Sequence, residues 1–319
     1  QKGGVYHITA ELYKQFGERR VINSPVDETS ILGFGIGFAH NGFIPIPEIQ
    51  FLAYLHNAED QLRGEAATLP FFSKGQFTNP MVLRVPGLAY QKGFGGHFHN
   101  DNSLTVFRDI PGIILAVPSN GADAVKMLRT SVREAYKNGR VIVFVEPIAL
   151  YMTKDLHKPK DGEWLCSYPE LESEIPVGEF AVYGTSEVLT IITYGNGLYL
   201  SLQAKKEIEK KTRKKIKVID LRWLAPINYE DLIRNIEKCK NILIVDECRK
   251  TGCHGEGILA NLLCGLNGKS KIELHAAKDS FIPLGVSATS TLPSKKSIIQ
   301  KGIDLSLIHI SEPTRRDQI

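Results

Sequence analysis

Short, continuously apolar runs alternate along this chain with longer helical stretches, and this alternation constrains the fold more than any other feature. Apolar runs without polar alternation are typical of strands covered on both faces, as in a parallel sheet. Strands are predicted at 20–25, 43–51, 80–86, 112–118, 141–147, 188–194, 215–224 and 241–247. Helices are predicted at 29–40, 121–138, 198–212 and 257–266. The sequence therefore predicts an α/β protein with parallel sheets.

Length and composition favour two domains. The chain has 319 residues, of which 43% are hydrophobic and 23% charged, and this excludes a disordered, collagen-like or disulfide-scaffold protein. Residues 154–174 are charged and contain prolines, so we interpret them as a linker between two α/β units. No apolar run approaches the roughly 20 residues of a membrane-spanning helix, and no membrane partner is predicted.

Charge and cysteine content limit the partners, the metal sites and the cellular location that we expect for this chain. The net charge of +4, from 39 basic and 35 acidic residues, is too small to indicate a nucleic-acid partner. The basic run at 205–215 is explained by a solvated helix face. Five cysteines without a zinc-type spacing are interpreted as reduced thiols, which predicts a cytoplasmic location and no metal site on this chain.

Both ends of the chain are unusual. It begins at Gln1 rather than at a methionine. The run LSLIHISEPTR, which starts at Leu305, resembles the conceptual translation of a sequencing-library adapter. We therefore expect residues 305–319 to be read-through that takes no part in the fold, and we expect the natural protein to start upstream.

Glu28 is the first candidate for a catalytic residue. It stands at the start of an apolar helix, directly after Asp27. A carboxylate at this position is either a helix cap or a buried acid, and because Asp27 already offers a cap, Glu28 is free for another role. The helix glycines at 33, 35 and 37 do not form the G-x-G-x-x-G dinucleotide fingerprint, and close packing explains them.

Two aromatic residues form the second candidate group. Phe51 and Tyr54 follow Glu48 at i+3 and i+6, where a strand runs into a helix. At that spacing they either stack on a flat ring or fill a core. The spacing alone favours the core.

The segment GFGGHFHNDN at 93–102 is the most informative part of the chain. Its glycines, Gly93, Gly95 and Gly96, let the backbone approach another group closely. His97 and His99 alternate along what we expect to be an extended stretch, so they are predicted to point to opposite sides. Two histidines in a glycine loop after a strand predict that at least one of them faces a site.

Taken together, these segments resemble a known family. The run YHITAELYKQFGERRVINSPVDETSILGFGIGFAHNGFIPIPEIQF, followed by GFGGHFHND, VIVFVEP, IITYGNG and VIDLRWLAPI, is similar to the beta subunit, or beta half, of thiamine-diphosphate-dependent 2-oxo acid dehydrogenases. This resemblance implies a pyrimidine-binding α/β domain at 1–158 that lacks its N-terminal elements. A linker at 159–175 and a transketolase C-terminal-like α/β domain at 176–304 would follow.

The resemblance also implies roles for the candidate residues. Glu28 matches the glutamate that hydrogen-bonds the aminopyrimidine ring and favours the imino tautomer, which takes the proton from the thiazolium carbon. Such a glutamate is expected to be buried. Phe51 and Tyr54 match the aromatic residues of the pyrimidine pocket, His99 the active-site histidine that binds substrate, and His97 its neighbour. Many relatives continue with Ser-Gln where this chain has Asn-Asp, which puts the substrate class in doubt.

Half of the cofactor site is absent from this chain. The family holds Mg²⁺ and the diphosphate with a G-D-G stretch and a downstream Asn, and no such motif occurs here. We therefore expect an alpha subunit, or an upstream alpha half, to supply both groups in a dimer of alpha-beta units. The implied reaction is oxidative decarboxylation of a 2-oxo acid with acyl transfer to the lipoyl acyltransferase component, in the cytoplasm or, in a eukaryote, the mitochondrial matrix. The alternatives are a transketolase or deoxyxylulose-phosphate synthase-type transferase and a non-catalytic subunit.

Overall fold

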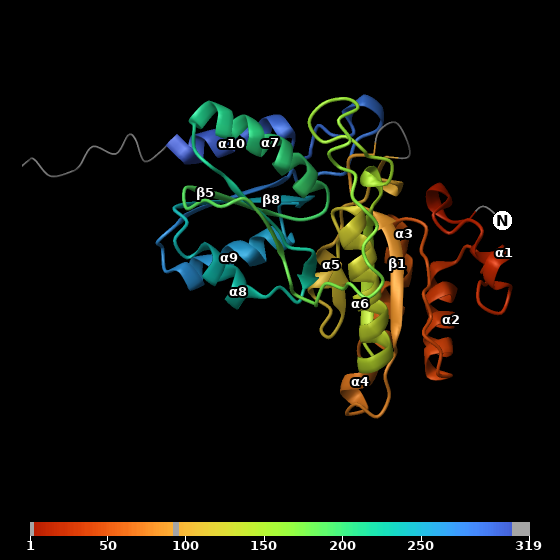
Figure 1. Ribbon diagram of the computed structural model, residues 1–319. Helices are drawn as coiled ribbons and strands as arrows, with labels where there is room; N and C mark the ends of the chain where they lie inside the picture. Colours follow the sequence, from red (N-terminus) through yellow and green to blue (C-terminus); the bar gives the residue numbers. More distant parts are fainter. Residues whose placement is uncertain (1–2, 92–95, 308–319) are drawn as a thin grey trace, which may run out of the picture.

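The computed structural model describes residues 3–91 and 96–307, which form two α/β units side by side (Figure 1). The first sheet has the strand order β1-β3-β2-β7; its first three strands are parallel, and β7 is antiparallel to β2. These strands span Met81–Gly87 (β1), Ile114–Ala116 (β2), Val141–Pro147 (β3) and Trp223–Ala225 (β7). We call the described residues up to 151, together with β7, the first unit.

Helices cover both faces of the first sheet. One face packs its apolar side chains against helices α2 and α3, and the other packs against α6. These helices span Glu28–His40 (α2), Leu52–Leu55 (α3) and Gly121–Asn138 (α6). Short helices and single turns complete the unit: Val5–His7, Leu12–Phe16 (α1), His56–Ala58, Gln61–Ala66, Leu69–Phe72 (α4), Gly96–Phe98, Thr105–Arg108 (α5) and Ile148–Leu150.

The second sheet has the strand order β4-β6-β5-β8-β9, with the edge strand β4 antiparallel and the other four strands parallel. Its strands span Ala181–Tyr183 (β4), Leu189–Thr193 (β5), Lys217–Asp220 (β6), Asn241–Arg249 (β8) and Lys271–Ala277 (β9). We call the described residues from 181 onward, without β7, the second unit.

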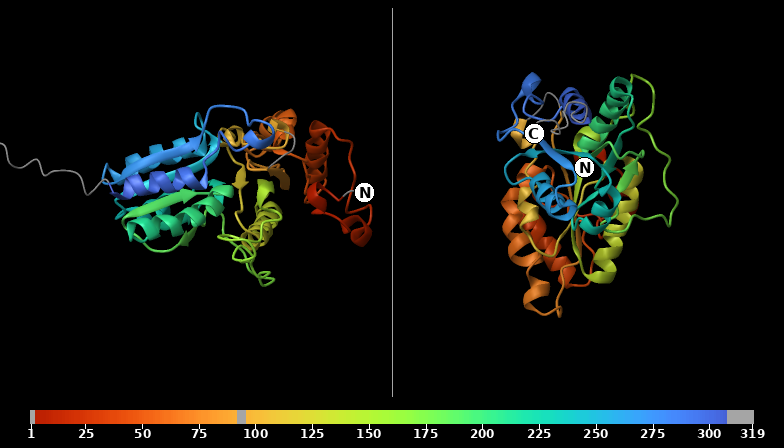
Figure 2. Two further views of the ribbon diagram at one scale, coloured as in Figure 1. Left: turned by 90° about the horizontal axis from the view of Figure 1, so that it is seen from above. Right: turned by 90° about the vertical axis from the view of Figure 1, so that its left-hand side faces the viewer.

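Two pairs of helices sandwich the second sheet in three layers (Figure 1), and Figure 2 shows the same unit from above and from its own side. One pair, α7 and α10, buries Leu198, Ile208 and Ile298 against one face, and the other pair, α8 and α9, packs on the opposite face. These helices span Asn196–Thr212 (α7), Tyr229–Ile236 (α8), His254–Leu266 (α9) and Lys295–Leu307 (α10), with a single turn at Gly285–Ser287. The predicted α/β class with mainly parallel sheets is thus confirmed.

The predicted strand at 215–224 is wrong in one respect, because it is two strands in two different sheets. After β6 the chain turns at Arg222, which has a left-handed φ of 61°, and continues as β7 in the first sheet. The Arg222 guanidinium donates to Asp123 at the start of α6, with Nε–Oδ2 and Nη2–Oδ1 distances of 2.9 and 3.0 Å. A continuous apolar pattern cannot reveal this break, since both halves are buried.

The N-terminal strand predictions are only partly correct. Residues 20–25 form a turn followed by irregular chain and no strand. The segment 43–51 does run beside β1: the Pro45 and Pro47 carbonyls accept from Val82 N and Arg84 N at 3.1 and 2.9 Å. It forms only one isolated bridge, between Glu48 and Arg84, because a proline has no N–H to donate to a regular ladder.

The predicted end of the second domain, at residue 304, falls inside helix α10, whereas the predicted linker is free of helices and strands. Every residue from 152 to 180 is described, and none of them lies in a helix or a strand. At the other end, α10 continues past residue 304, and Leu305 is fully buried against the second sheet. Residues 308–319 lie outside the described ranges. No described helix is both long and apolar enough to cross a membrane.

Candidate active site

Glu28 lies at the first turn of α2. As predicted, Asp27 is the cap: its carboxylate accepts a hydrogen bond from Ser30 N at 3.3 Å. The Glu28 side chain is buried, with 8% exposure, and no described side chain forms an ion pair with it. Thr29 Oγ1 donates to the Asn57 carbonyl at 3.0 Å, which holds this end of α2 against the turn that follows α3.

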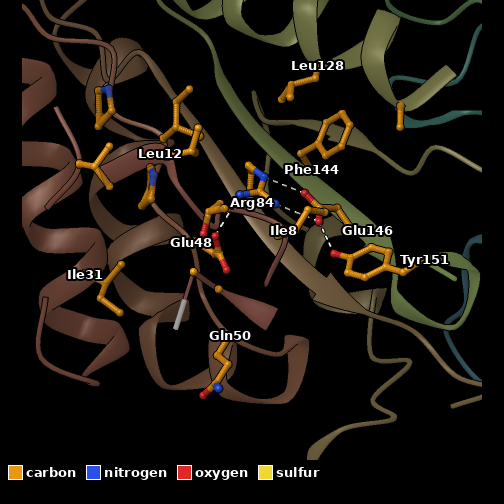
Figure 3. A pocket seen from close by; sticks show the side chains of 18 of the residues that line it. Ile8, Leu12, Ile31, Glu48, Gln50, Arg84, Leu128, Phe144, Glu146 and Tyr151 are labelled. Atoms are coloured by element: carbon orange, nitrogen blue, oxygen red, sulfur yellow. Dashed lines mark hydrogen bonds and ion pairs between the residues drawn. The ribbon is translucent and has the colours of Figure 1, made fainter. Parts of the chain in front are cut away.

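A large cavity opens beside Glu28. It has a volume of about 2020 Å³ and lies between α2, the segment 43–50 and α6, with residues of the N-terminal segment 3–26 along one side. Figure 3 shows its lining, in which apolar side chains such as Ile31 and Leu128 surround a group of charged ones. This volume exceeds the roughly 300–1,000 Å³ of a small-molecule pocket. The cavity therefore has room for more than one small ligand.

A buried charge network forms the floor of this cavity. Arg84 on β1 donates from Nε to Glu146 Oε1 at 2.7 Å and from Nη1 to Glu48 at 3.0 Å, and Tyr151 donates to Glu146 (Figure 3). Burial lowers the pKa of Arg84, but the Glu146 and Glu48 carboxylates outweigh burial and raise it. Burial and Glu146 together raise the pKa of Tyr151. Arg84 therefore stays a cation, and Tyr151 stays a neutral hydrogen-bond donor.

No role was predicted for this network from the sequence. Its signal was present, because Arg84 and Glu146 are the charged residues within two strands that are otherwise apolar. The parallel pairing of β1 and β3 places these strands side by side. A charged residue in each of two buried neighbouring strands predicts an ion pair, since an unpaired buried charge is costly.

The structure brings three of the predicted site residues together. The Phe51 and His99 rings lie 4.4 Å apart between centroids and nearly perpendicular, and Tyr54 lies 6.0 Å from Phe51 and 6.3 Å from His99. Phe51 is buried against Val5 and Ile148, whereas Tyr54 and His99 are half-buried. These side chains form an aromatic wall that carries an imidazole.

The predicted extended stretch around His97 is wrong. Gly96–Phe98 is a turn of 3₁₀-helix, and His97 is exposed, with its ring 4.1 Å from Phe98 and 5.7 Å from Phe281. Gly93 and Gly95 lie outside the described residues. Gly96 shows why a glycine is needed here: its φ is +50°, and a Cβ would lie 2.5 Å from Leu284 Cδ2. The expected close approach is thus to a side chain of the second unit.

Asn100 fixes the backbone next to His99. Its Oδ1 accepts from Gln91 N at 3.0 Å, and its Nδ2 donates to Gln91 O at 2.9 Å. The side chain therefore bridges the two ends of the glycine loop, and it is almost fully buried. The departure from Ser-Gln at this position thus has a structural role in this chain.

Glu28 and the aromatic wall lie on neighbouring surfaces. Glu28 and Gln50 both line the large cavity, and Gln50 directly precedes Phe51. Phe51, Tyr54, His97 and His99 themselves do not line it. Within residues 3–91 and 96–307, no group of three or more His, Cys, Asp or Glu side chains is arranged to hold a metal ion.

Comparison with known proteins places this arrangement in a family. Residues 1–152 match the family described as the transketolase pyrimidine-binding domain, and residues 178–280 match the transketolase C-terminal domain. The pyruvate dehydrogenase E1 component subunit beta of Bacillus subtilis is 30% identical over 309 residues, which are 93% of this chain and 87% of that protein. The subunit of the same name from Staphylococcus epidermidis is 31% identical over 306 residues, 94% of this chain and 87% of its own length.

The chain belongs to the E1 beta-subunit family. Membership confirms the predicted fold class and the predicted function as the beta portion of a 2-oxo acid dehydrogenase component. A solved structure described as a split-gene transketolase, an inactive beta4 tetramer, superposes with a TM-score of 0.70 at 17% identity. It covers 96% of this chain and 90% of that one, and at this identity it shows the fold alone.

Proposed function

We propose that this chain binds the aminopyrimidine half of thiamine diphosphate and helps to decarboxylate a 2-oxo acid oxidatively, with transfer of the acyl group to a lipoyl domain. The observation that carries the proposal is the buried Glu28 carboxyl at the start of α2, which lines the large cavity together with Gln50, the residue before Phe51 of the aromatic wall. Thiamine diphosphate supplies the carbanion chemistry, and the protein supplies binding, orientation and electrostatics.

The residues present fit an aminopyrimidine ring. A buried carboxyl group without an ion-pair partner among the described side chains is available to a ring nitrogen of a ligand. Phe51 and Tyr54 offer aromatic surface for the ring, at 6.0 Å from one another. Glu28 would hold or give a proton at that nitrogen, and the apolar side chains around it would exclude water.

The substrate side of the proposal rests on His99. Its ring lies against Phe51 at 4.4 Å, and Asn100 fixes the backbone that follows it. A half-buried imidazole held in this way can bind the carboxylate of a 2-oxo acid or the acyl group. His97 is exposed beside Phe98, so it would contact the substrate from the solvent side.

Partners complete the proposed site. An alpha subunit, or an alpha half of the same chain, would bring Mg²⁺ and the diphosphate, and two alpha-beta units would form a dimer. The lipoyl acyltransferase component would receive the acyl group, in the cytoplasm or, in a eukaryote, the mitochondrial matrix. In support of association, Phe71, Phe72 and Phe77 near α4 are each at least 60% exposed, as is typical of an interaction surface.

The first experiment replaces Glu28 in the complete alpha-beta complex. Glu28→Gln is expected to keep thiamine diphosphate binding, measured by calorimetry, and to lower the decarboxylation rate by about 10²–10⁴-fold, as for loss of a general acid–base group. Asp27→Asn is the matched control, because asparagine keeps the helix cap. Glu28→Gln activity within about twofold of the parent would contradict the role, since that is under 0.5 kcal/mol of barrier.

The second experiment separates the two histidines. His99→Ala is expected to reduce turnover and acyl transfer far more than cofactor affinity, because the histidine contacts the reacting group. His97→Ala is the neighbouring control and is expected to have the weaker effect. Equal and mild effects of both variants would show that the two histidines are structural.

A further inference from the structure

Asp101, two residues after His99, lies at the centre of a polar cluster that the proposed chemistry does not use. Its Oδ2 lies 3.0 Å from His56 Nε2, and its Oδ1 accepts from Ser103 Oγ at 2.7 Å. The Arg249 guanidinium lies 4.0 Å from the same Oδ1. Asp101 itself is only 9% exposed, whereas the side chains of His56 and Arg249 are 33% and 31% exposed.

This cluster connects the two parts of the aromatic wall. His56 directly follows α3, the helix that carries Tyr54, whereas Asp101 belongs to the loop that carries His99. The pair joins positions 45 residues apart in the chain. A shift of Asp101 relative to His56 would therefore move the His99 loop relative to the wall that it packs against.

The second unit holds the same loop from the other side. Arg249, the last residue of β8, donates from Nη1 to Asn102 Oδ1 at 3.0 Å and also donates to Ser103. Asn102 Nδ2 donates to the Glu247 carbonyl at 2.7 Å. The loop after His99 is thus fixed to the first unit through His56 and to the second unit through two residues of β8.

Charge explains why an aspartate suits this position. One carboxylate faces the imidazole of His56 and the guanidinium of Arg249, with Glu59 as the further acid that acts on His56. The hydrogen bond to Asp101 raises the pKa of His56 despite burial and despite Arg249. Burial raises the pKa of Asp101, but the hydrogen bonds from His56 and Ser103 outweigh burial and lower it. Without the carboxylate, burial and Arg249 would lower the pKa of His56.

We propose that Asp101 is a positioning residue that holds His99 against the Phe51–Tyr54 wall by linking His56 of the first unit to Arg249 of the second. This inference rests on the proposed function, in which His99 contacts the substrate. It adds a residue that acts on the reaction through His99 and touches no reacting atom itself.

The test uses the complete alpha-beta complex with Asp101→Asn and, as a milder second variant that keeps a hydrogen-bond donor, His56→Gln. Asp101→Asn is expected to lower kcat by about tenfold or more, the effect of losing a charged hydrogen bond, while thiamine diphosphate affinity stays within about twofold. The double variant is expected to be no worse than Asp101→Asn, since both changes break the same contact. Additive losses, or an unchanged kcat in both single variants, would overturn the inference.

A matched control and a direct readout separate this inference from the proposed function. His157 and Glu163 form a similar pair, 3.6 Å apart, in the stretch between the two units, so Glu163→Gln is the control and should leave kcat unchanged. With histidine-selective isotope labelling, Asp101→Asn should shift the NMR signals of His99 and lower the pKa of His56. Unmoved His99 signals would overturn the inference. Moved signals together with normal turnover of His99→Ala would refute the proposed function and support the positioning role.

Discussion

The two α/β units of this chain differ in the regularity of their sheets and in how many large apolar side chains they leave exposed. The second unit has five strands with a helix pair on each face. The first has four strands, one of them from a distant part of the chain, and its outermost segment, 43–50, borders a cavity of about 2020 Å³. The first unit also carries most of the exposed large apolar side chains, among them Phe34, Phe38, Phe43, Phe71, Phe72 and Phe77.

We interpret the second unit as a scaffold and the first unit as the part that carries the candidate site. The second unit is regular because most of its buried side chains pack within its own core. It contributes to the site through the hydrogen bonds between β8 and the loop that follows His99. The first unit is irregular around Glu28, the wall and the cavity, and α3 is only four residues long. Functional residues commonly lie on such irregular segments held by a rigid scaffold.

The largest expected effect comes from breaking the strand that joins the units. Trp223→Ala on β7 removes one of the largest fully buried side chains and should lower the free energy of unfolding by about 3–5 kcal/mol. Trp164, half-buried in the stretch between the units, is the control, and its alanine variant should cost less. Urea unfolding followed by circular dichroism measures both, and a smaller loss for Trp223 would mean that β7 contributes little to the first sheet.

The next effect concerns a buried acid of the second unit. Burial raises the pKa of Asp220 to about 7, because the hydrogen bonds from Ser119 and the Arg222 backbone and the charge of Arg222 offset burial only in part. The folded chain therefore keeps a proton that the unfolded chain releases above about pH 4, so stability from this group is present below pH 4 and falls as pH rises to 7. The fall amounts to up to about 4 kcal/mol. Unfolding free energies from pH 4 to 8 should decline less steeply in Asp220→Asn, and equal slopes would contradict the shift.

A smaller effect is expected from the charge network in the cavity floor. Arg84→Met leaves Glu48 and Glu146 without their shared cation and should cost about 3 kcal/mol of unfolding free energy. In the second unit, Lys205→Met breaks the more exposed pair with Glu209 and should cost less than about 1 kcal/mol. If both variants lost the same amount in urea unfolding, the first unit's network would have no special role in stability.

The smallest effect tests whether the units differ at their helix ends. Asn120 caps α6 in the first unit and Asn228 caps α8 in the second, each by accepting from a backbone N–H at 3.0 and 3.1 Å. Either change to alanine should cost about 1 kcal/mol. Thermal unfolding of the two variants should give similar shifts. A clearly larger loss at Asn120 would show that the first unit tolerates a lost helix cap less well than the second unit does.

Strong local patterns made most of the fold predictable. The continuous apolar strands at 80–86, 141–147 and 241–247 and the amphipathic helix at 121–138 are all observed, because burial on both faces or one face determines such patterns. The errors lie where tertiary context decides. Two prolines disrupt the ladder of the segment 43–51, and a left-handed Arg222 divides one apolar run between two sheets.

The sequence named candidate site residues but could not give the contacts between them. The resemblance identified Glu28, Phe51, Tyr54 and His99, and the structure gathers the last three into one wall. The hydrogen bond between His56 and Asp101, which connects the two parts of the wall, could not be predicted. The two residues are 45 positions apart, and no periodic pattern in the sequence relates them. The roles of these site residues remain predictions for the variants proposed above.

The strand β7 also sets the order in which this chain can finish folding as it is made. Ribosomes add about 5–20 residues per second, and N-terminal parts generally fold first. The edge of β2 that β7 covers must wait for several seconds at that rate, while the linker, α7 and β6 are still being synthesised. An open strand edge is a template for another chain. On crowded polysomes, the nascent first unit is therefore exposed to mispairing until residue 225 emerges.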